Sequence, residues 1–171
     1  FLVIINSINF IDGIDGLAIS EVIKTILLIE FFSASETALI TLSLLLTISL
    51  LPLYYFNFKK KGKVFLGDGG SLLLGTIISI YVFYVLGSNF EFKAGLAINK
   101  TLFSVLILLY PLVDLLRVFI IRIKNGNSPF EPDQNHIHHF LINRKYSQFK
   151  SLLIIEIIST IIPLTIIYCL T

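Results

Sequence analysis

Long apolar segments recur along the chain and constrain its fold more than any other feature. The segments 37–56, 71–88, 101–121 and 151–170 are each close to the roughly 20 residues that a helix needs to cross a bilayer core. Hydrophobic residues form 56% of the sequence and the mean hydropathy is +0.90, which is more than the core of a soluble domain absorbs. The sequence therefore predicts an integral membrane protein.

The predicted fold is all-α, a polytopic transmembrane helix bundle of about five spans. Open strand edges cannot be satisfied in lipid, and no alternating pattern supports a barrel, so each span is expected to be a helix. A weaker apolar segment at 17–32 completes the five, and Glu21 and Lys24 inside it are spaced to pair on one helix face. Residues 1–171 are interpreted as part of a single membrane domain.

Basic residues gather on one side of this predicted bundle. With alternating spans, the polar segments 6–16, 57–70 and 122–150 fall on the same face and carry most of the Lys and Arg, whereas Lys93 and Lys100 fall on the other. An excess of Lys and Arg in short loops marks the cytoplasmic face. The pattern therefore indicates one cytoplasmic site assembled from three loops.

The first polar segment combines two asparagines with two Asp-Gly pairs, at Asn6, Asn9, Asp12 and Asp15. Carboxylate and amide oxygens suit Mg²⁺, which proteins usually hold with one or two carboxylates and substrate phosphates. The alternative is a set of Asx turns and caps at the start of a helix. Two such pairs behind two asparagines favour the functional interpretation.

The second segment ends in FLGDGGSLLLG, where Asp68 stands at the mouth of an apolar span. A carboxylate there is costly without a partner, which makes it a functional candidate. A glycine-rich turn into a helix N-terminus attracts anions, but the lysine of a P-loop is missing. Two interpretations stay open, a metal ligand beside a phosphate and a cap of a helix starting near Ser71. The lysines at 59–61 and 63 are expected to set topology and contact anionic headgroups.

The third segment holds every histidine of the chain, His136, His138 and His139. Three histidines without a nearby cysteine would hold zinc only in an open, catalytic type of site. They could equally bind phosphate oxygens or act in acid–base chemistry.

Polar residues inside the spans have simpler interpretations. Asp114 and Arg117 are three residues apart and are interpreted as an ion pair on a helix surface. Glu156 has no assigned partner, and Cys169 is expected to be buried as a small hydrophobic residue.

Three motifs in order, NSINFIDGIDGLA (6–18), FLGDGGSLLLG (65–75) and SPFEPDQNHIHH (128–139), resemble the polyprenyl-phosphate N-acetylhexosamine-1-phosphate transferases of glycosyltransferase family 4. The resemblance implies transfer of a sugar 1-phosphate, as from UDP-GlcNAc, to undecaprenyl phosphate with release of UMP. Such reactions start cell-envelope glycans such as the O-antigen of lipopolysaccharide. It also implies Mg²⁺ as cofactor, with Mn²⁺ as the alternative, and a multi-pass enzyme of the bacterial inner membrane with cytoplasmic active-site loops.

By motif position, the resemblance makes Asp68 a Mg²⁺ ligand and Asn9 a second ligand. Asp15 would face the uracil of the donor, and Asn6 and Asp12 would shape that pocket.

The histidines, with Arg122 assisting, would hold the pyrophosphate or the sugar. The residues expected at the catalytic centre are Asp12, Asp15, Asp68, His136, His138 and His139. The expected partners are the two substrates and the lipid bilayer, without nucleic acid, and the pattern is compatible with an oligomer.

The family also carries an adjacent Asp-Asp motif on an earlier loop, and this sequence contains no Asp-Asp pair. We therefore expect residues 1–171 to be the C-terminal portion of a longer enzyme and to be inactive alone. Two alternatives stay open, a truncated membrane scaffold and a transporter with Asp68, Asp114 and Glu156 along an ion path. A transporter places polar groups near the middle of broken helices, whereas here they gather at one face.

Overall fold

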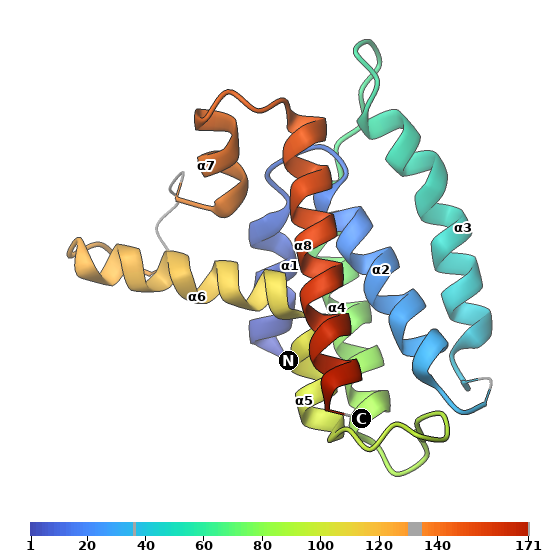
Figure 1. The fold of residues 1–171 in the computed structure, drawn as a ribbon. Coiled ribbons are helices and arrows are strands. Elements are labelled where there is room, and N and C mark those ends of the chain that lie inside the picture. Colours follow the sequence, from blue (N-terminus) through green and yellow to red (C-terminus); the bar gives the residue numbers. More distant parts are fainter. Residues whose placement is uncertain (36, 130–134, 171) are drawn as a thin grey trace.

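The computed structural model describes residues 1–35, 37–129 and 135–170, and this part of the chain forms a bundle of eight helices (Figure 1). The remaining residues include 130–134 of the third motif. The predicted all-α class is confirmed. The helices are α1 (Leu2–Ile11), α2 (Leu17–Phe32), α3 (Ile40–Asn57), α4 (Gly67–Leu86), α5 (Lys100–Ile107), α6 (Leu109–Lys124), α7 (Ile137–Asn143) and α8 (Gln148–Cys169).

Three of the described helices, α3, α4 and α8, are long and apolar enough to cross a membrane, and the bent pair α5 and α6 would make a fourth span. Their outer faces are apolar: Leu45, Ile48 and Leu51 on α3 are each more than half exposed. Side chains of this kind on the outside of a bundle suit lipid rather than water as the surrounding medium.

Helix α2 has the bounds that the sequence predicts but only 16 residues, and it contacts α1, α3, α4 and α8. Val22, Ile26 and Ile29 are fully buried, and Glu21 is buried with them. A helix surrounded by other helices contacts protein rather than lipid on most sides. Its weaker hydropathy therefore follows from an interior position, where polar groups find partners.

The short helix α1 packs mainly against α4 because Gly75 allows their backbones to approach. A Cβ atom at Gly75 would lie 2.8 Å from the Cα atom of Ile5, closer than two such carbons can come. Small residues commonly allow close helix pairs of this kind. This packing places the C-terminal end of α1 beside the first turn of α4, where the polar motifs begin.

The segment 101–121 does not form one continuous helix as the sequence predicts, because the chain breaks at Leu108 and α5 and α6 are bent by 73°. Pro111 explains the position of the break. In a continuous helix its ring would collide with the carbonyl group of Ile107, the residue four before it and the last one of α5. Helix α6 therefore leaves the bundle sideways, below α7 in Figure 1.

A buried polar cluster joins α2 to α8. The Nζ atom of Lys24 lies 2.6 Å from Oε2 of Glu21, 3.7 Å from Oε2 of Glu156 and 2.6 Å from Oγ of Ser159. The predicted pair of Glu21 and Lys24 is confirmed, and Glu156 gains a partner that the sequence did not assign. The expected burial of Cys169 is wrong, because this residue is exposed at the end of α8.

Candidate functional site

The first two motifs meet where α1 ends and α4 begins. The Nδ2 atom of Asn9 donates to Oγ of Ser71 at 2.8 Å and lies 3.5 Å from Oδ1 of Asp68. The predicted association of Asn9 with Asp68 is thereby seen in the geometry. Because Nδ2 is used for these contacts, the amide oxygen of Asn9 is the atom that can accept from or coordinate a ligand.

The helix that follows Asp68 begins earlier than the sequence predicts. Helix α4 starts at Gly67, so Asp68 stands in its first turn, and no side chain caps the N-terminus. The cap interpretation is therefore wrong. Gly67 has a φ of 67°, a left-handed conformation that a residue with a Cβ atom rarely adopts. An exposed carboxylate is thus held at the positive end of a helix.

A polar cavity of about 470 Å³ lies in front of this turn. The loop between α1 and α2, the segment that leads into α4, and the start of α8 line it. Its lining residues are Asp12, Gly13, Ile14, Asp15, Asn57, Lys63, Phe65, Leu66, Gly67, Asp68 and Gln148. The predicted residue Asn6 is not among them, because it lies on α1 and donates to the carbonyl group of Leu2 at 2.8 Å.

Lys63 and Asn57 are among the lining residues that the sequence did not assign to a site. The Nζ atom of Lys63 lies 2.5 Å from Oδ1 of Asp15, an ion pair at the cavity. Asn57 accepts from the backbone N–H of Gly16 at 2.6 Å and donates to the carbonyl group of Val64 at 2.8 Å. The closeness of Lys63 to the second motif could have indicated a place in the site. A role in setting the membrane topology, however, explained this lysine equally well.

Asp68 affects the ionisation of Asp12 across the cavity. Partial burial, and then the negative charge of Asp68, raise the pKa of Asp12 to about 7. Two carboxylates in one polar cavity suit a divalent cation, which neutralises both. Among the described residues, no group of three or more His, Cys, Asp or Glu side chains could hold a metal ion by itself. The donor set of this cavity therefore fits a divalent cation only if further ligands come from other molecules.

Helix α6 holds residues 135–139, the histidine segment, in place. The buried carboxylate of Asp114 lies 2.7 Å from Nδ1 of His136 through Oδ2 and accepts from the backbone N–H of Ile137 at 2.8 Å through Oδ1. The predicted pair of Asp114 with Arg117 is therefore wrong. Arg117 instead donates to the carbonyl group of Asn135. The sequence could not show the contact of Asp114 with His136, because these two residues are 22 positions apart and meet only through the fold.

Arg122 is buried, donates to the carbonyl group of Pro129 at 2.5 Å and lies over the ring of Phe10, 5.6 Å from its centroid. Its predicted role at the substrate is untested. The observed contacts connect α6 to the third motif and to α1, so this side chain also orders the site.

The histidine rings contact the first motif. The ring centroids of His136 and His138 are 5.4 Å apart, and those of His138 and His139 are 4.3 Å apart. A Cβ atom at Gly13 would lie 2.1 Å from Nε2 of His138. Since Gly13 also lines the polar cavity, the cavity and the histidine cluster adjoin there.

His138 differs from a cationic phosphate ligand. Burial, and then the neighbouring histidines, lower its pKa from 6.5 to about 3, so the ring is neutral near pH 7. Neither ring nitrogen has a hydrogen-bond partner among the described residues. A neutral ring offers one donor and one acceptor rather than a positive charge.

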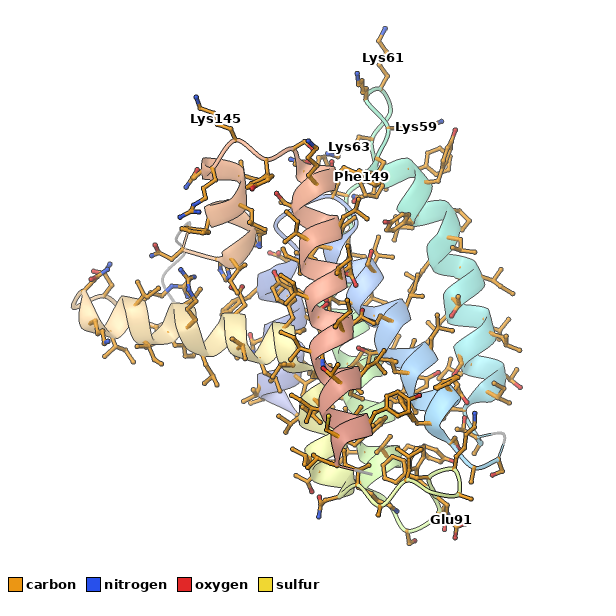
Figure 2. The ribbon with its side chains drawn as sticks, viewed as in Figure 1. Lys59, Lys61, Lys63, Glu91, Lys145 and Phe149 are labelled. Carbon is orange, nitrogen blue, oxygen red and sulfur yellow. The ribbon has the colours of Figure 1, made fainter. Side chains whose placement is uncertain are left out.

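The site lies at the basic end of the bundle. Figure 2 shows Lys59, Lys61, Lys63 and Lys145 at this end and Glu91 at the opposite end. The predicted clustering of basic side chains around the three motifs is confirmed. The fold and the site together define an all-α membrane bundle with acidic, amide and histidine side chains gathered at one basic end.

The chain belongs to glycosyl transferase family 4, whose family model matches residues 1–86. It is 35% identical over 168 residues to the Bacillus subtilis (strain 168) protein named "Probable undecaprenyl-phosphate N-acetylglucosaminyl 1-phosphate transferase", covering 95% of this chain and 44% of that protein. None of the solved structures gives a significant match to this chain.

Two further relatives carry similar names. The decaprenyl-phosphate N-acetylglucosaminephosphotransferase of Mycobacterium leprae is 31% identical over 89% of this chain and 42% of its own length. The undecaprenyl-phosphate alpha-N-acetylglucosaminyl 1-phosphate transferase of Escherichia coli K12 is 29% identical over 92% of this chain and 43% of its own length. The chain thus spans less than half of the relatives that it matches.

Proposed function

We propose that this chain forms part of a membrane phosphoglycosyl transferase that moves N-acetylglucosamine 1-phosphate from UDP-N-acetylglucosamine to undecaprenyl phosphate and releases UMP. The observation that carries this proposal is the meeting of Asp12 and Asp68 in one cavity that adjoins the histidine cluster at Gly13, with Asn9 next to Asp68. The names of the relatives in Bacillus subtilis and Escherichia coli support the reaction class. The activity is proposed for the whole protein rather than for this portion.

The polar cavity is suited to the nucleotide half of the donor. Phe65 at its edge is 68% exposed and offers an aromatic face on which a base can stack. Asp15, held by Lys63, and Asn57 provide the hydrogen-bonding groups nearby. The first turn of α4 would offer its free backbone N–H groups to the diphosphate.

Mg²⁺, with Mn²⁺ as the alternative, would be held by Asp68 and the amide oxygen of Asn9, with Asp12 beside them. When bound, the cation would neutralise the charge that develops on the phosphoryl oxygens. The chain itself keeps Asn9 in the required orientation through Ser71. His136, His138 and His139 would contact the phosphates or the sugar from the other side of Gly13.

The acceptor must keep its polyprenyl chain in lipid while its phosphate reaches the site. An apolar cavity of about 370 Å³ between α6, α7 and α8 meets this need. Tyr110, Val113, Ile137, Phe140 and Ile158 are among its lining residues. Because Ile137 directly follows His136, the apolar cavity and the histidine cluster are neighbours.

The basic end of the bundle is assigned to the cytoplasm of a bacterial cell, with the bundle in the inner membrane. An ion pathway receives no support, because its three candidate residues have separate environments. Asp68 faces Asn9, Asp114 contacts His136, and Glu156 lies near Lys24.

The test is transfer of radiolabelled sugar phosphate from UDP-N-acetylglucosamine to undecaprenyl phosphate by the whole protein in nanodiscs containing Mg²⁺. Asp68→Asn keeps the shape of the side chain and removes its charge, so we expect transfer to fall at least about a hundredfold. Glu91→Gln makes the same change at the opposite end of the bundle and should leave transfer intact. Full activity of Asp68→Asn, or no transfer by the wild-type protein, would contradict the proposal.

A further inference from the structure

We infer that Asp114 is a positioning residue for the transfer reaction, because it fixes the Nδ1–H form of His136 and leaves Nε2 as the ring nitrogen that meets the substrate. This inference rests on the proposed function. Its basis is the contact of one fully buried carboxylate with both the histidine ring and the helix that carries the cluster.

The carboxylate determines where the ring proton lies. An ionised carboxylate only accepts hydrogen bonds, so the 2.7 Å contact between Oδ2 of Asp114 and Nδ1 of His136 requires a proton on Nδ1. A carboxylate that accepts from one imidazole nitrogen sets the tautomer and the orientation of the whole ring. Nε2 then remains for a phosphate or hydroxyl group of the substrate.

The second oxygen of Asp114 fixes the backbone of the same segment. It accepts at 2.8 Å from the N–H of Ile137, the first residue of α7. The same carboxylate therefore holds both the histidine ring and the start of the helix. A helix of seven residues has little stability of its own and depends on such contacts. The carboxylate therefore controls both the position and the protonation of His136.

Helix α6 extends this control over the rest of the segment. Arg117 donates to the carbonyl group of Asn135, and Arg122 donates to that of Pro129. Both arginines bind backbone atoms, whereas Asp114 contacts an imidazole. The 73° bend before α6 brings this helix to the histidine segment, so the bend has a role at the site.

The variant Asp114→Asn separates positioning from simple support. Its amide oxygen can still accept from the N–H of Ile137, so α7 remains anchored. Its NH₂ group, however, is a donor and can meet Nδ1 of His136 only if Nδ1 carries no proton. The substitution therefore keeps the shape of the site and moves the ring proton to Nε2.

The experiment uses the whole protein, labelled with ¹⁵N-histidine and reconstituted in nanodiscs, with His136 assigned by its loss in His136→Gln. We expect a protonated Nδ1 in the wild-type protein and an unprotonated Nδ1 in Asp114→Asn. In the transfer assay, kcat of Asp114→Asn should fall about 10- to 100-fold, the usual effect of losing such a supporting partner. KM for the donor should change much less. Leu116→Ala, on the exposed side of α6, should change neither the spectrum nor the activity.

The ¹⁵N signal and the transfer assay test the positioning role of Asp114 and the proposed function separately. An unchanged Nδ1 signal in Asp114→Asn overturns the inference whatever the activity, and so does a switched signal with full activity. A wild-type protein that shows the expected signals but transfers nothing overturns the proposed function, and with it the use of this contact in catalysis.

Discussion

Gly13→Ala tests whether the first motif and the histidine cluster are packed as tightly as the structure indicates. The new Cβ atom would lie 2.1 Å from Nε2, 2.6 Å from Cε1 and 3.1 Å from Cδ2 of His138. The backbone of Gly13 is not in the left-handed region, so the effect of the substitution is steric. The ring of His138 is fully buried and stacks on His136, which leaves it little room to move.

The expected cost follows from overpacking of a buried contact, which is about 1–3 kcal/mol. If this cost falls on the docking of α7, the undocked population rises about 5- to 150-fold, since 1.4 kcal/mol corresponds to a factor of ten. Hydrogen exchange of the α7 amides, Ile137–Asn143, followed by mass spectrometry measures this population.

Gly69→Ala is the matched control, because its Cβ atom would have no neighbour within 4 Å. It adds the same methyl group to another motif and should leave exchange in α7 unchanged. The double variant Gly13→Ala/His138→Ala should lose less protection than the sum of the single variants, because the clash is removed. Unchanged exchange in Gly13→Ala would refute the contact between the two motifs.

The remaining predictions concern buried charge. Lys24→Ala leaves Glu21 and Glu156 without their cation and should destabilise the protein by about 3–5 kcal/mol, measured as a lower unfolding temperature in detergent; an unchanged temperature would exclude a stabilising role for the cluster. The pKa of His138 is lowered from 6.5 to about 3, so the stability that this neutral ring contributes is complete above pH 6.5 and is lost as the pH falls toward 3. At pH 5 the loss is about 2 kcal/mol, which faster exchange in α7 should report. His138→Gln does not titrate and should abolish this pH dependence, and its persistence in that variant would assign it to another group.

Hydropathy and short-range spacing were sufficient for the helices α2, α3, α4 and α8, whereas α7 lies within, and α1 extends into, segments that the sequence analysis treated as polar loops. Runs of apolar residues predicted α3, α4 and α8, and the weak segment at 17–32 is helix α2 with the same bounds. The pair of Glu21 and Lys24 followed from helix periodicity alone. These features depend on residues within a turn or two of one another, so the local sequence contains the information.

The break before α6 could be predicted only in part from the sequence. Pro111 is visible in the sequence, but a proline near the start of a span is compatible with a kinked helix or with two helices. Only the tertiary structure shows that the chain turns by 73° there. That angle then decided the partners of Asp114, which faces the histidine segment instead of pairing with Arg117.

The sequence by itself thus determined a helical membrane bundle and the three motifs that supply its polar site. Only the tertiary structure decided that Lys63 pairs with Asp15, that Asp114 holds His136 and that Lys24 lies near Glu156. These pairs are distant in sequence, and each ionic side chain had several plausible local interpretations. Their choice depends on the angles and distances at which helices pack, which residue patterns do not specify.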